Sequence, residues 1–145
     1  MATALFFKNP MLGLETVKAV TGHGEDACLA LIESGRIRYA FDLATPNRHR
    51  RLVRVFALSL VDFVQNTDTQ PPTLDGVVRF ILPGSSPELH ASWLARKLNV
   101  SHTHVHHLLH ARCITEVKDP ERRKTNDRIA NRASAMKFLT SRRCI

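Results

Sequence analysis

The sequence predicts an α+β fold that is mainly helical and is built from two tandem units of the same layout. One order of helical and strand-like patterns occurs twice along the chain. A polar, proline-containing stretch without apolar periodicity, QNTDTQPPTLDG at 65–76, separates the two copies. The excess of positive charge lies wholly in the second copy. We therefore expect a first unit at 1–66, a linker at 67–78 and a second unit at 79–145.

The first copy opens with two short helical patterns. Residues 14–22, LETVKAVTG, predict a helix that ends at Gly22. Residues 25–35 predict a second helix that ends at Gly35, because glycine readily takes the left-handed conformation that follows a helix. Two strands and a short closing helix are expected at 36–43, 52–57 and 58–65.

The second copy repeats this order. PELHASWLARKLN at 87–99 predicts a helix that starts on proline. Ser101 is expected to cap the next helix, HTHVHHLLHAR, because a serine hydroxyl can accept a hydrogen bond from the first turn. We expect a strand at 113–117, a polar connection at 118–126, a return strand at 127–131 and a closing helix at 132–141.

A gapless alignment supports a duplication. It places GHGEDACLALIESGRI over NVSHTHVHHLLHARCI, so that the apolar positions of the two copies coincide. The matched pairs are Cys28 with Val105, Leu31 with Leu108, Ile32 with Leu109 and Ile37 with Ile114, and Ser59 and Phe63 run parallel to Ser134 and Phe138. The similarity is one of pattern and is weak in identity.

The net charge of +8 points to a polyanionic partner. Residues 1–75 contain eight basic and eight acidic residues, whereas residues 76–145 contain 13 basic and five acidic residues. A basic half of this kind favours nucleic acid, and a solubilising surface is the alternative. No run approaches the ~20 apolar residues that span a bilayer, and the first residues lack the pattern of a signal peptide. With three widely spaced cysteines, these features predict a cytoplasmic, nucleoid-associated protein.

Two short helices joined by a tight turn and followed by a two-stranded wing make a winged helix-turn-helix. The run WLARKLNVSHTHVHHLL carries the most specific form of this pattern. Its apolar residues occupy one face of each helix: Leu94, Ala95 and Leu98 in the first, and Val105, Leu108 and Leu109 in the second. The second unit is therefore expected to be the main reader of DNA.

This run resembles the MerR/excisionase-like group of winged helix-turn-helix DNA-binding domains, in which LAxxLxVSxxTVxxLI precedes a wing and an RxSxxxFL helix. Arg132-Ala133-Ser134…Phe138-Leu139 fits that ending, and IESGRI at 32–37 fits the start of the wing in the first copy. The resemblance covers nearly the whole chain as two units. It implies that the protein binds double-stranded DNA. The first role implied is transcription regulation as a repressor, and the second is control of the recombination of a mobile element. The chain departs from MerR regulators proper, because it has no long dimerisation helix and no cysteine pair for an effector metal.

The helix after Ser101 is the candidate recognition helix. Such a helix presents its N-terminal, outward residues to base edges in the major groove. Short side chains that donate and accept hydrogen bonds suit this role, and both ring nitrogens of a protonated histidine are donors. The predicted DNA-contacting residues are Ser101, His102, Thr103, His106, His107 and His110, with His104 nearer the boundary of the buried face. A plain polar surface is the alternative.

Basic residues around this helix are expected to contact the DNA backbone, which sets affinity and register. They are Lys118, Arg122, Arg123 and Lys124 in the second wing, Arg96 and Lys97 late in the preceding helix, and Arg142 and Arg143 in the tail. In the first unit, Glu25 and Asp26 occupy the DNA-facing positions and would repel phosphates. That unit is expected to bind weakly through its wing, Arg48, Arg50, Arg51 and Arg54, or to act in protein interaction or dimerisation; a solvated loop is the alternative.

Five of the eight histidines lie within 102–110, which also raises the question of a metal site. His102, His106 and His110 share one stripe, but the helical rise separates its ends by about 12 Å, so one zinc ion at ~2 Å from each ligand cannot bind all three. No cofactor is expected. The sequence contains no P-loop, catalytic triad or paired acidic residues that would predict an enzyme. A metal-dependent nuclease built on the histidines is the alternative from the class of enzymes. The expected partner is double-stranded DNA, and no contact with a membrane is expected. A second copy of the chain in a homodimer, and a recombinase or other DNA-bound protein, are possible further partners.

Overall fold

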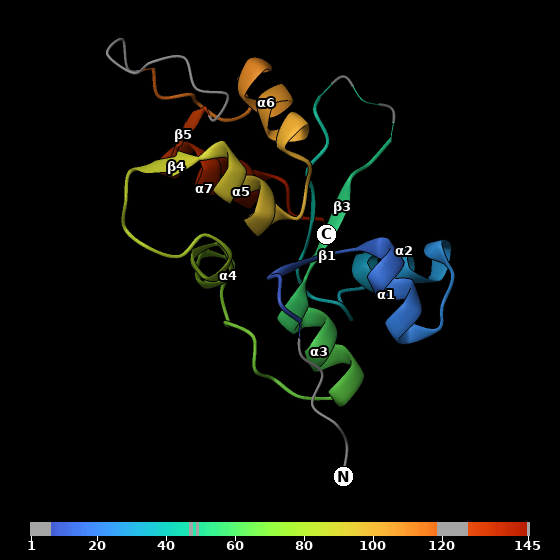
Figure 1. Ribbon diagram of the computed structural model, residues 1–145. Coiled ribbons are helices and arrows are strands. Elements are labelled where there is room, and N and C mark those ends of the chain that lie inside the picture. The colour runs from blue at the N-terminus through green and yellow to red at the C-terminus, as the bar shows by residue number, and fades with distance from the viewer. Residues whose placement is uncertain (1–6, 47, 49, 119–127, 145) are drawn as a thin grey trace.

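The computed structural model describes residues 7–46, 48, 50–118 and 128–144. Within them the chain has seven helices and five short strands, the α+β class that the sequence predicts (Figure 1). The elements are β1 (Met11–Gly13), α1 (Leu14–Thr21), α2 (Glu25–Glu33), β2 (Ala40–Asp42), β3 (Val53–Phe56), α3 (Ala57–Gln65), α4 (Leu74–Ile81), β4 (Glu88–His90), α5 (Ala91–Leu98), α6 (His102–His110), β5 (Ile129–Asn131) and α7 (Arg132–Ser141). None of the helices described is both long enough and apolar enough to cross a membrane.

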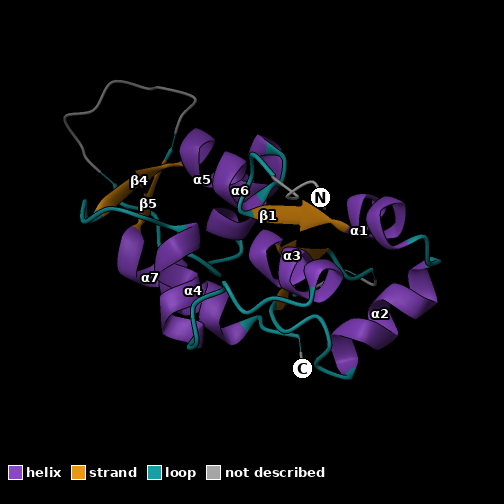
Figure 2. Cartoon of the chain, turned by 90° about the horizontal axis from the view of Figure 1, so that it is seen from below, coloured by secondary structure: helices purple, strands orange, loops and turns teal. Residues whose placement is uncertain are grey.

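The two halves of the chain pair their strands in the same way. In the first, β3 lies between β1 and β2, and all pairs are antiparallel. In the second, β4 pairs with β5, and Glu116 forms a bridge to Ala130 on the other side of β5. In each unit, therefore, the first strand is followed by two helices. An antiparallel pair of extended segments comes next, and one closing helix follows that pair. Figure 2 shows the two units side by side, with α1 and α2 at one end and β4 and β5 at the other.

Local backbone geometry repeats as well. Gly22 ends α1 in the left-handed conformation with φ 73°, and Asn99 ends α5 in the same way with φ 54°. After the next helix of each unit, Gly35 and Arg112 have φ 80° and 59°. These are the pairs that the gapless alignment matches. A left-handed turn follows both helices of each unit, because this turn brings the next element back onto the core.

Equivalent serines hold equivalent strands. The Ser59 hydroxyl accepts a hydrogen bond from the main-chain nitrogen of Tyr39 at 3.1 Å. Ser134 in the second unit accepts one from Thr115 at 2.7 Å. Each serine lies at the start of the closing helix of its unit and ties that helix to the segment that follows the second helix.

The strands differ from the expectation at several points. Met11–Gly13 form β1, where no element is expected, and β2 takes only Ala40–Asp42 of the strand expected at 36–43. The helix expected from Pro87 begins only at Ala91, because Glu88–His90 form β4. The strand expected at 113–117 is reduced to the bridge at Glu116, flanked by main-chain hydrogen bonds from Val117 to Ile129 and from Asn131 to Thr115. Three-residue strands carry no readable periodicity, so their partners in distant parts of the chain decide them.

The segment predicted as a linker at 67–78 is largely packed structure. Helix α4 begins inside it at Leu74, capped by Thr73, whose hydroxyl accepts from the Gly76 nitrogen at 3.1 Å. The stretch before α4 is bound to the end of α3, where the buried Asp62 carboxylate accepts hydrogen bonds from hydroxyls and main-chain nitrogens of residues 67–70. Burial raises the pKa of Asp62, but these hydrogen bonds together outweigh it and lower the pKa below its usual value.

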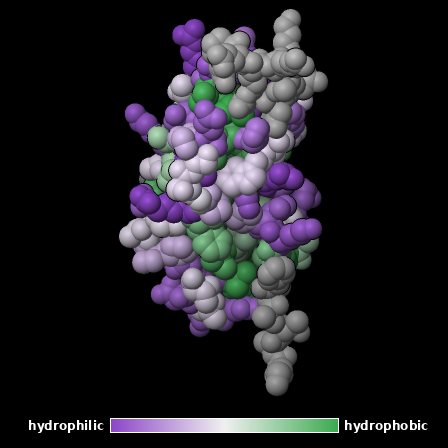
Figure 3. Space-filling model, turned by 60° about the vertical axis from the view of Figure 1, so that its left-hand side comes forward, coloured by the Kyte–Doolittle hydropathy of each residue, from purple (hydrophilic) through white to green (hydrophobic). Residues whose placement is uncertain are grey.

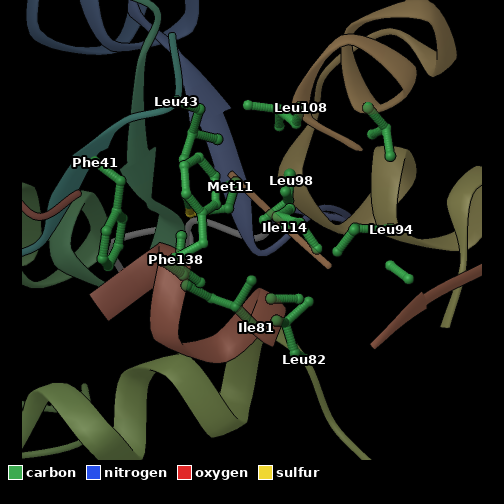
Figure 4. Close-up of a cluster of buried hydrophobic side chains, with 14 of the residues drawn as sticks. Met11, Phe41, Leu43, Ile81, Leu82, Leu94, Leu98, Leu108, Ile114 and Phe138 are labelled. Carbon is green, nitrogen blue, oxygen red and sulfur yellow. The ribbon is translucent and has the colours of Figure 1, made fainter. Parts of the chain in front are cut away.

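The two units share a hydrophobic core. One buried cluster joins Met11, Phe41 and Leu43 of the first unit to Leu94, Leu98 and Leu108 of α5 and α6, and Figure 4 shows these side chains converging. Residues of α4 and α7 complete this cluster. A second cluster lies within the first unit and includes Cys144 of the tail. Phe80 on α4 is 50% exposed, and on the face shown in Figure 3 hydrophilic residues surround smaller areas of hydrophobic surface.

The C-terminal tail lies along β2 of the first unit. The Asp42 nitrogen donates to the Arg142 oxygen at 2.8 Å, and the Cys144 nitrogen donates to the Ala40 oxygen at 2.7 Å. The guanidinium groups of Arg142 and Arg143 donate to main-chain oxygens of Ala44 and Arg38. Both side chains are thus directed to the first unit, and their contact with DNA stays a prediction.

Candidate nucleic-acid interface

Helix α6 divides into a buried and an exposed face, as its pattern predicts. It begins after Ser101, whose hydroxyl accepts from the His104 nitrogen at 3.0 Å, so the cap is confirmed. The buried face packs on α5 and on the shared core through Val105, Leu108 and Leu109. The outer positions are Ser101, His102, Thr103, His107 and His110, which are exposed, and His106, which is half-buried.

His104 is buried, although the sequence only places it near the boundary. Its Nε2 lies 2.6 Å from the main-chain oxygen of Leu43, which can only accept, so Nε2 carries the hydrogen. Burial lowers the pKa of His104, and the positive charges of Arg48, His107 and Arg54 lower it further, while the hydrogen bond to Leu43 acts in the opposite sense. His104 thus fastens α6 to the first unit.

On one side α6 borders the connection from β2 to β3 (Figure 1). A hollow of about 260 Å³ lies between them, lined by Arg48 and Arg54 of the first unit and by Ser101, Thr103, His104 and His107 of the second. The structure thus brings an arginine of the first wing next to the candidate recognition helix. No local sequence signal could show this neighbourhood, because the residues are about 50 positions apart in the chain.

At its C-terminal end α6 borders the segment in which the second wing is expected. A hollow of about 390 Å³ is lined there by His110, Arg112, Thr115, Glu116, Lys118 and Arg128. Arg128 pairs with Glu116 at 3.0 Å, whereas Lys118 is exposed. Arg112 was not singled out from the sequence, and its position directly after α6 is the signal that could have found it. Arg122, Arg123 and Lys124 lie outside the described residues.

The other predicted arginines and lysines are dispersed. Lys97 lies over the ring of Trp93, with Nζ 5.5 Å from the ring centroid, and Arg96 lines a separate hollow beside the same ring. Trp93 itself is half-buried and packs against the shared core. In the first wing Arg50 is exposed, and Arg51 lies 3.7 Å from a carboxylate oxygen of both Glu33 and Asp42.

The histidine pair on the outer side of α6 is close. The ring centroids of His102 and His106 are 4.4 Å apart, as one helical turn allows. Within the described residues, however, no group of three or more histidine, cysteine, aspartate or glutamate side chains could hold a metal ion. The chemistry that the outer face offers is that of hydrogen-bond donors and acceptors beside positive charge.

Comparison with known proteins gives no significant match: no family model, no curated protein and no solved structure is similar to this chain. The resemblance to the MerR/excisionase-like group therefore stays an expectation, carried by the sequence pattern alone.

Proposed function

We propose that the chain is a sequence-specific double-stranded DNA-binding protein without catalytic activity, which acts as a transcriptional regulator and most simply as a repressor. In this proposal each unit is a winged helix-turn-helix. α5 and α6 form the helix-turn-helix of the second unit, and the segment at 115–117 with β5 forms the base of its wing. The observation that supports it best is that α6 buries its apolar stripe and leaves a polar face without acidic residues exposed.

The first turn of α6 is suited to base edges in a major groove. His102 and Thr103 are exposed at the helix N-terminus, which is the end that a recognition helix inserts. Imidazole and hydroxyl groups can donate to guanine N7 and O6 or accept from exocyclic amines. Lys118 and Arg112 at the wing base supply positive charge for the adjoining phosphates. Base choice would thus come from the helix, and affinity from the cations that surround it.

A second candidate is a recombination directionality factor of excisionase type. Such a protein must contact a recombinase while it is bound to DNA, and the half-exposed Phe80 on α4, whose ring centroid lies 5.5 Å from that of Phe56, is a position at which such a contact can be tested. It would also bend its DNA. A gel assay in which the site is moved along a fragment separates the two candidates, because a bending protein changes mobility with site position and a simple repressor does not.

Selection of bound duplexes from a random pool tests the main proposal, followed by footprinting on genomic DNA around the protein's own gene. We expect an enriched sequence, bound at least 10³-fold more tightly than random duplex, with affinity that falls steeply as salt rises. Equal affinity for selected and random duplex, or no dependence on salt, would contradict it. Incubation with plasmid and Mg²⁺ or Zn²⁺ tests the nuclease alternative: cleavage that disappears in a His102→Ala/His106→Ala double variant would replace our proposal.

A further inference from the structure

The hollow between α6 and the β2–β3 connection is built from both units. Arg48, Leu52 and Arg54 line it from the first unit, and the second unit lines it with Val100, Ser101, Thr103, His104 and His107. Its volume is about 260 Å³, and none of the described residues that line it is acidic. Two arginines and the hydroxyl-bearing Thr103 therefore border the same space beside the exposed face of α6.

Two hydrogen bonds hold the walls of this hollow together. Arg54 donates from Nε to the Asn99 oxygen at 2.7 Å, directly before α6 begins. His104, in the first turn of α6, donates from Nε2 to Leu43 at 2.6 Å, directly after β2. Both bonds cross from one unit to the other, so they tie β3 and the end of β2 to the start of α6.

The field inside the hollow is positive. After burial, the charge of Arg48 is the first of the positive charges that lower the pKa of His104, and that of Arg54 adds to it. The N-terminal end of α6, a helix of nine residues, adds its partial positive charge on the same side. Planar guanidinium groups, hydroxyl groups and a helix N-terminus together suit an oxyanion, and the backbone phosphate is the oxyanion that a DNA duplex presents.

We propose that this hollow binds one phosphate group of the DNA backbone, at the edge of the groove that α6 enters, between Arg48 of the first unit and Thr103 and His107 of the second. The inference rests on the proposed function and deepens it, because it gives the first unit a direct contact with the same duplex. Arg54 positions the site through Asn99, and Arg48 is the cation that contacts the phosphate.

Replacement of Arg48 tests the proposal. The affinity of labelled duplex for the wild type and for the Arg48→Ala variant is measured by fluorescence anisotropy over a series of chloride concentrations. We expect the slope of log affinity against log salt to be shallower by about 0.9 in the variant. At 0.15 M salt the variant should bind roughly five-fold more weakly, and selected and random duplex should be affected alike. The Arg48→Lys variant should keep the slope, since it keeps the charge.

Arg79→Ala is the matched control. It removes one exposed arginine from α4, where the side chain pairs with Asp75 and lines none of the hollows beside α6. Its slope should equal that of the wild type. If Arg48→Ala and Arg79→Ala change the slope by the same amount, the effect is one of net charge and the site is refuted.

Three further outcomes are separable. A wild type that binds duplex steeply with salt, together with an Arg48→Ala variant of unchanged slope, refutes this site and leaves the proposed function standing. A wild type that binds no duplex refutes both. If inorganic phosphate at constant ionic strength raises the melting temperature of the wild type but not of Arg48→Ala, while the salt slopes of the two proteins are equal, the hollow takes up free phosphate and not the backbone.

Discussion

Arg54 on β3 donates from Nε to the main-chain oxygen of Asn99 at 2.7 Å, and from Nη1 to its neighbour Val53 at 3.0 Å. Asn99 is the left-handed residue that ends α5 and begins the turn to α6. Carbonyl groups at the end of a helix lack partners within it, so an external cation stabilises them. The arginine that the sequence assigns to DNA thus supports the turn of the other unit, and the orientation of α6 depends on the first unit.

Replacement of Arg54 should therefore destabilise the protein. Arg54→Ala leaves the partly buried Asn99 oxygen without its charged donor, and we expect the free energy of unfolding to fall by about 1–3 kcal/mol. Urea denaturation measures this as a lower midpoint. Arg50→Ala, which removes an exposed arginine of the same connection, should stay within about 0.5 kcal/mol of the wild type. Equal midpoints for the two variants would show that the bond to Asn99 contributes nothing.

The shared core should make the two units unfold together. Phe41 is fully buried in the first unit, and the protein's single tryptophan, Trp93, lies on α5 of the second. Phe41→Ala should lower the free energy of unfolding by about 3–5 kcal/mol through the cavity it leaves. Because the cluster is continuous, the transition reported by Trp93 fluorescence should shift by as much as that reported by circular dichroism. A Trp93 transition that keeps its wild-type midpoint would mean that the units fold independently.

Acid should weaken the contact between α6 and the first unit. The pKa of His104 is lowered in the folded protein, first by burial, so the unfolded chain takes up this proton before the folded one does. The stability that the buried, neutral His104 contributes is fully present above the ordinary histidine pKa of about 6.5, and it declines as pH falls below that value. We expect His104→Gln to be less stable than the wild type at pH 8, but to lose less stability between pH 8 and pH 5.5. His23→Gln, at an exposed position, should follow the wild type. Parallel losses in all three proteins would contradict this role of His104.

Base discrimination should reside on the outer side of α6. A variant with His102, Thr103 and His106 replaced by alanine should lose about 1–3 kcal/mol of discrimination between selected and random duplex for each base that the helix no longer reads. The salt slope should stay close to that of the wild type, since these side chains are proposed to contact base edges and not phosphates. Anisotropy titrations on the two duplexes measure both quantities. Unchanged discrimination with normal folding would show that α6 does not read bases.

Replacement of Arg122 and Arg123 by alanine should have the opposite signature. A wing that binds phosphates contributes to affinity without regard to sequence, so selected and random duplex should be weakened alike. The salt slope should fall by about 0.9 for each phosphate that the wing no longer neutralises. A variant that binds random duplex as well as the wild type does, at every salt concentration, would exclude the wing from the interface.

Most local elements of this protein can be predicted from the sequence. Gly22 and Gly35 mark the ends of the first two helices, Ser101 caps α6, and the expected closing helix at 132–141 is α7. These elements are readable because caps, left-handed turns and apolar spacing act between residues a few positions apart. The same local patterns predicted the repeated layout of the halves and which face of α6 is buried.

The way these elements meet could not be predicted, because it depends on contacts between distant parts of the chain. β1 and β4 exist through pairing with strands some 40 positions away, and α4 forms in a segment whose sequence indicates a linker. The sequence places Arg54 in a wing of the first unit and His104 near the boundary of the buried face of a helix in the second, yet each bonds to a main-chain oxygen of the other unit. A side chain's chemistry limits what it can bind, but its partner depends on which distant segment the shared core brings beside it. No local pattern encodes that neighbour, so the composite hollow at the start of α6 is visible only in the folded chain.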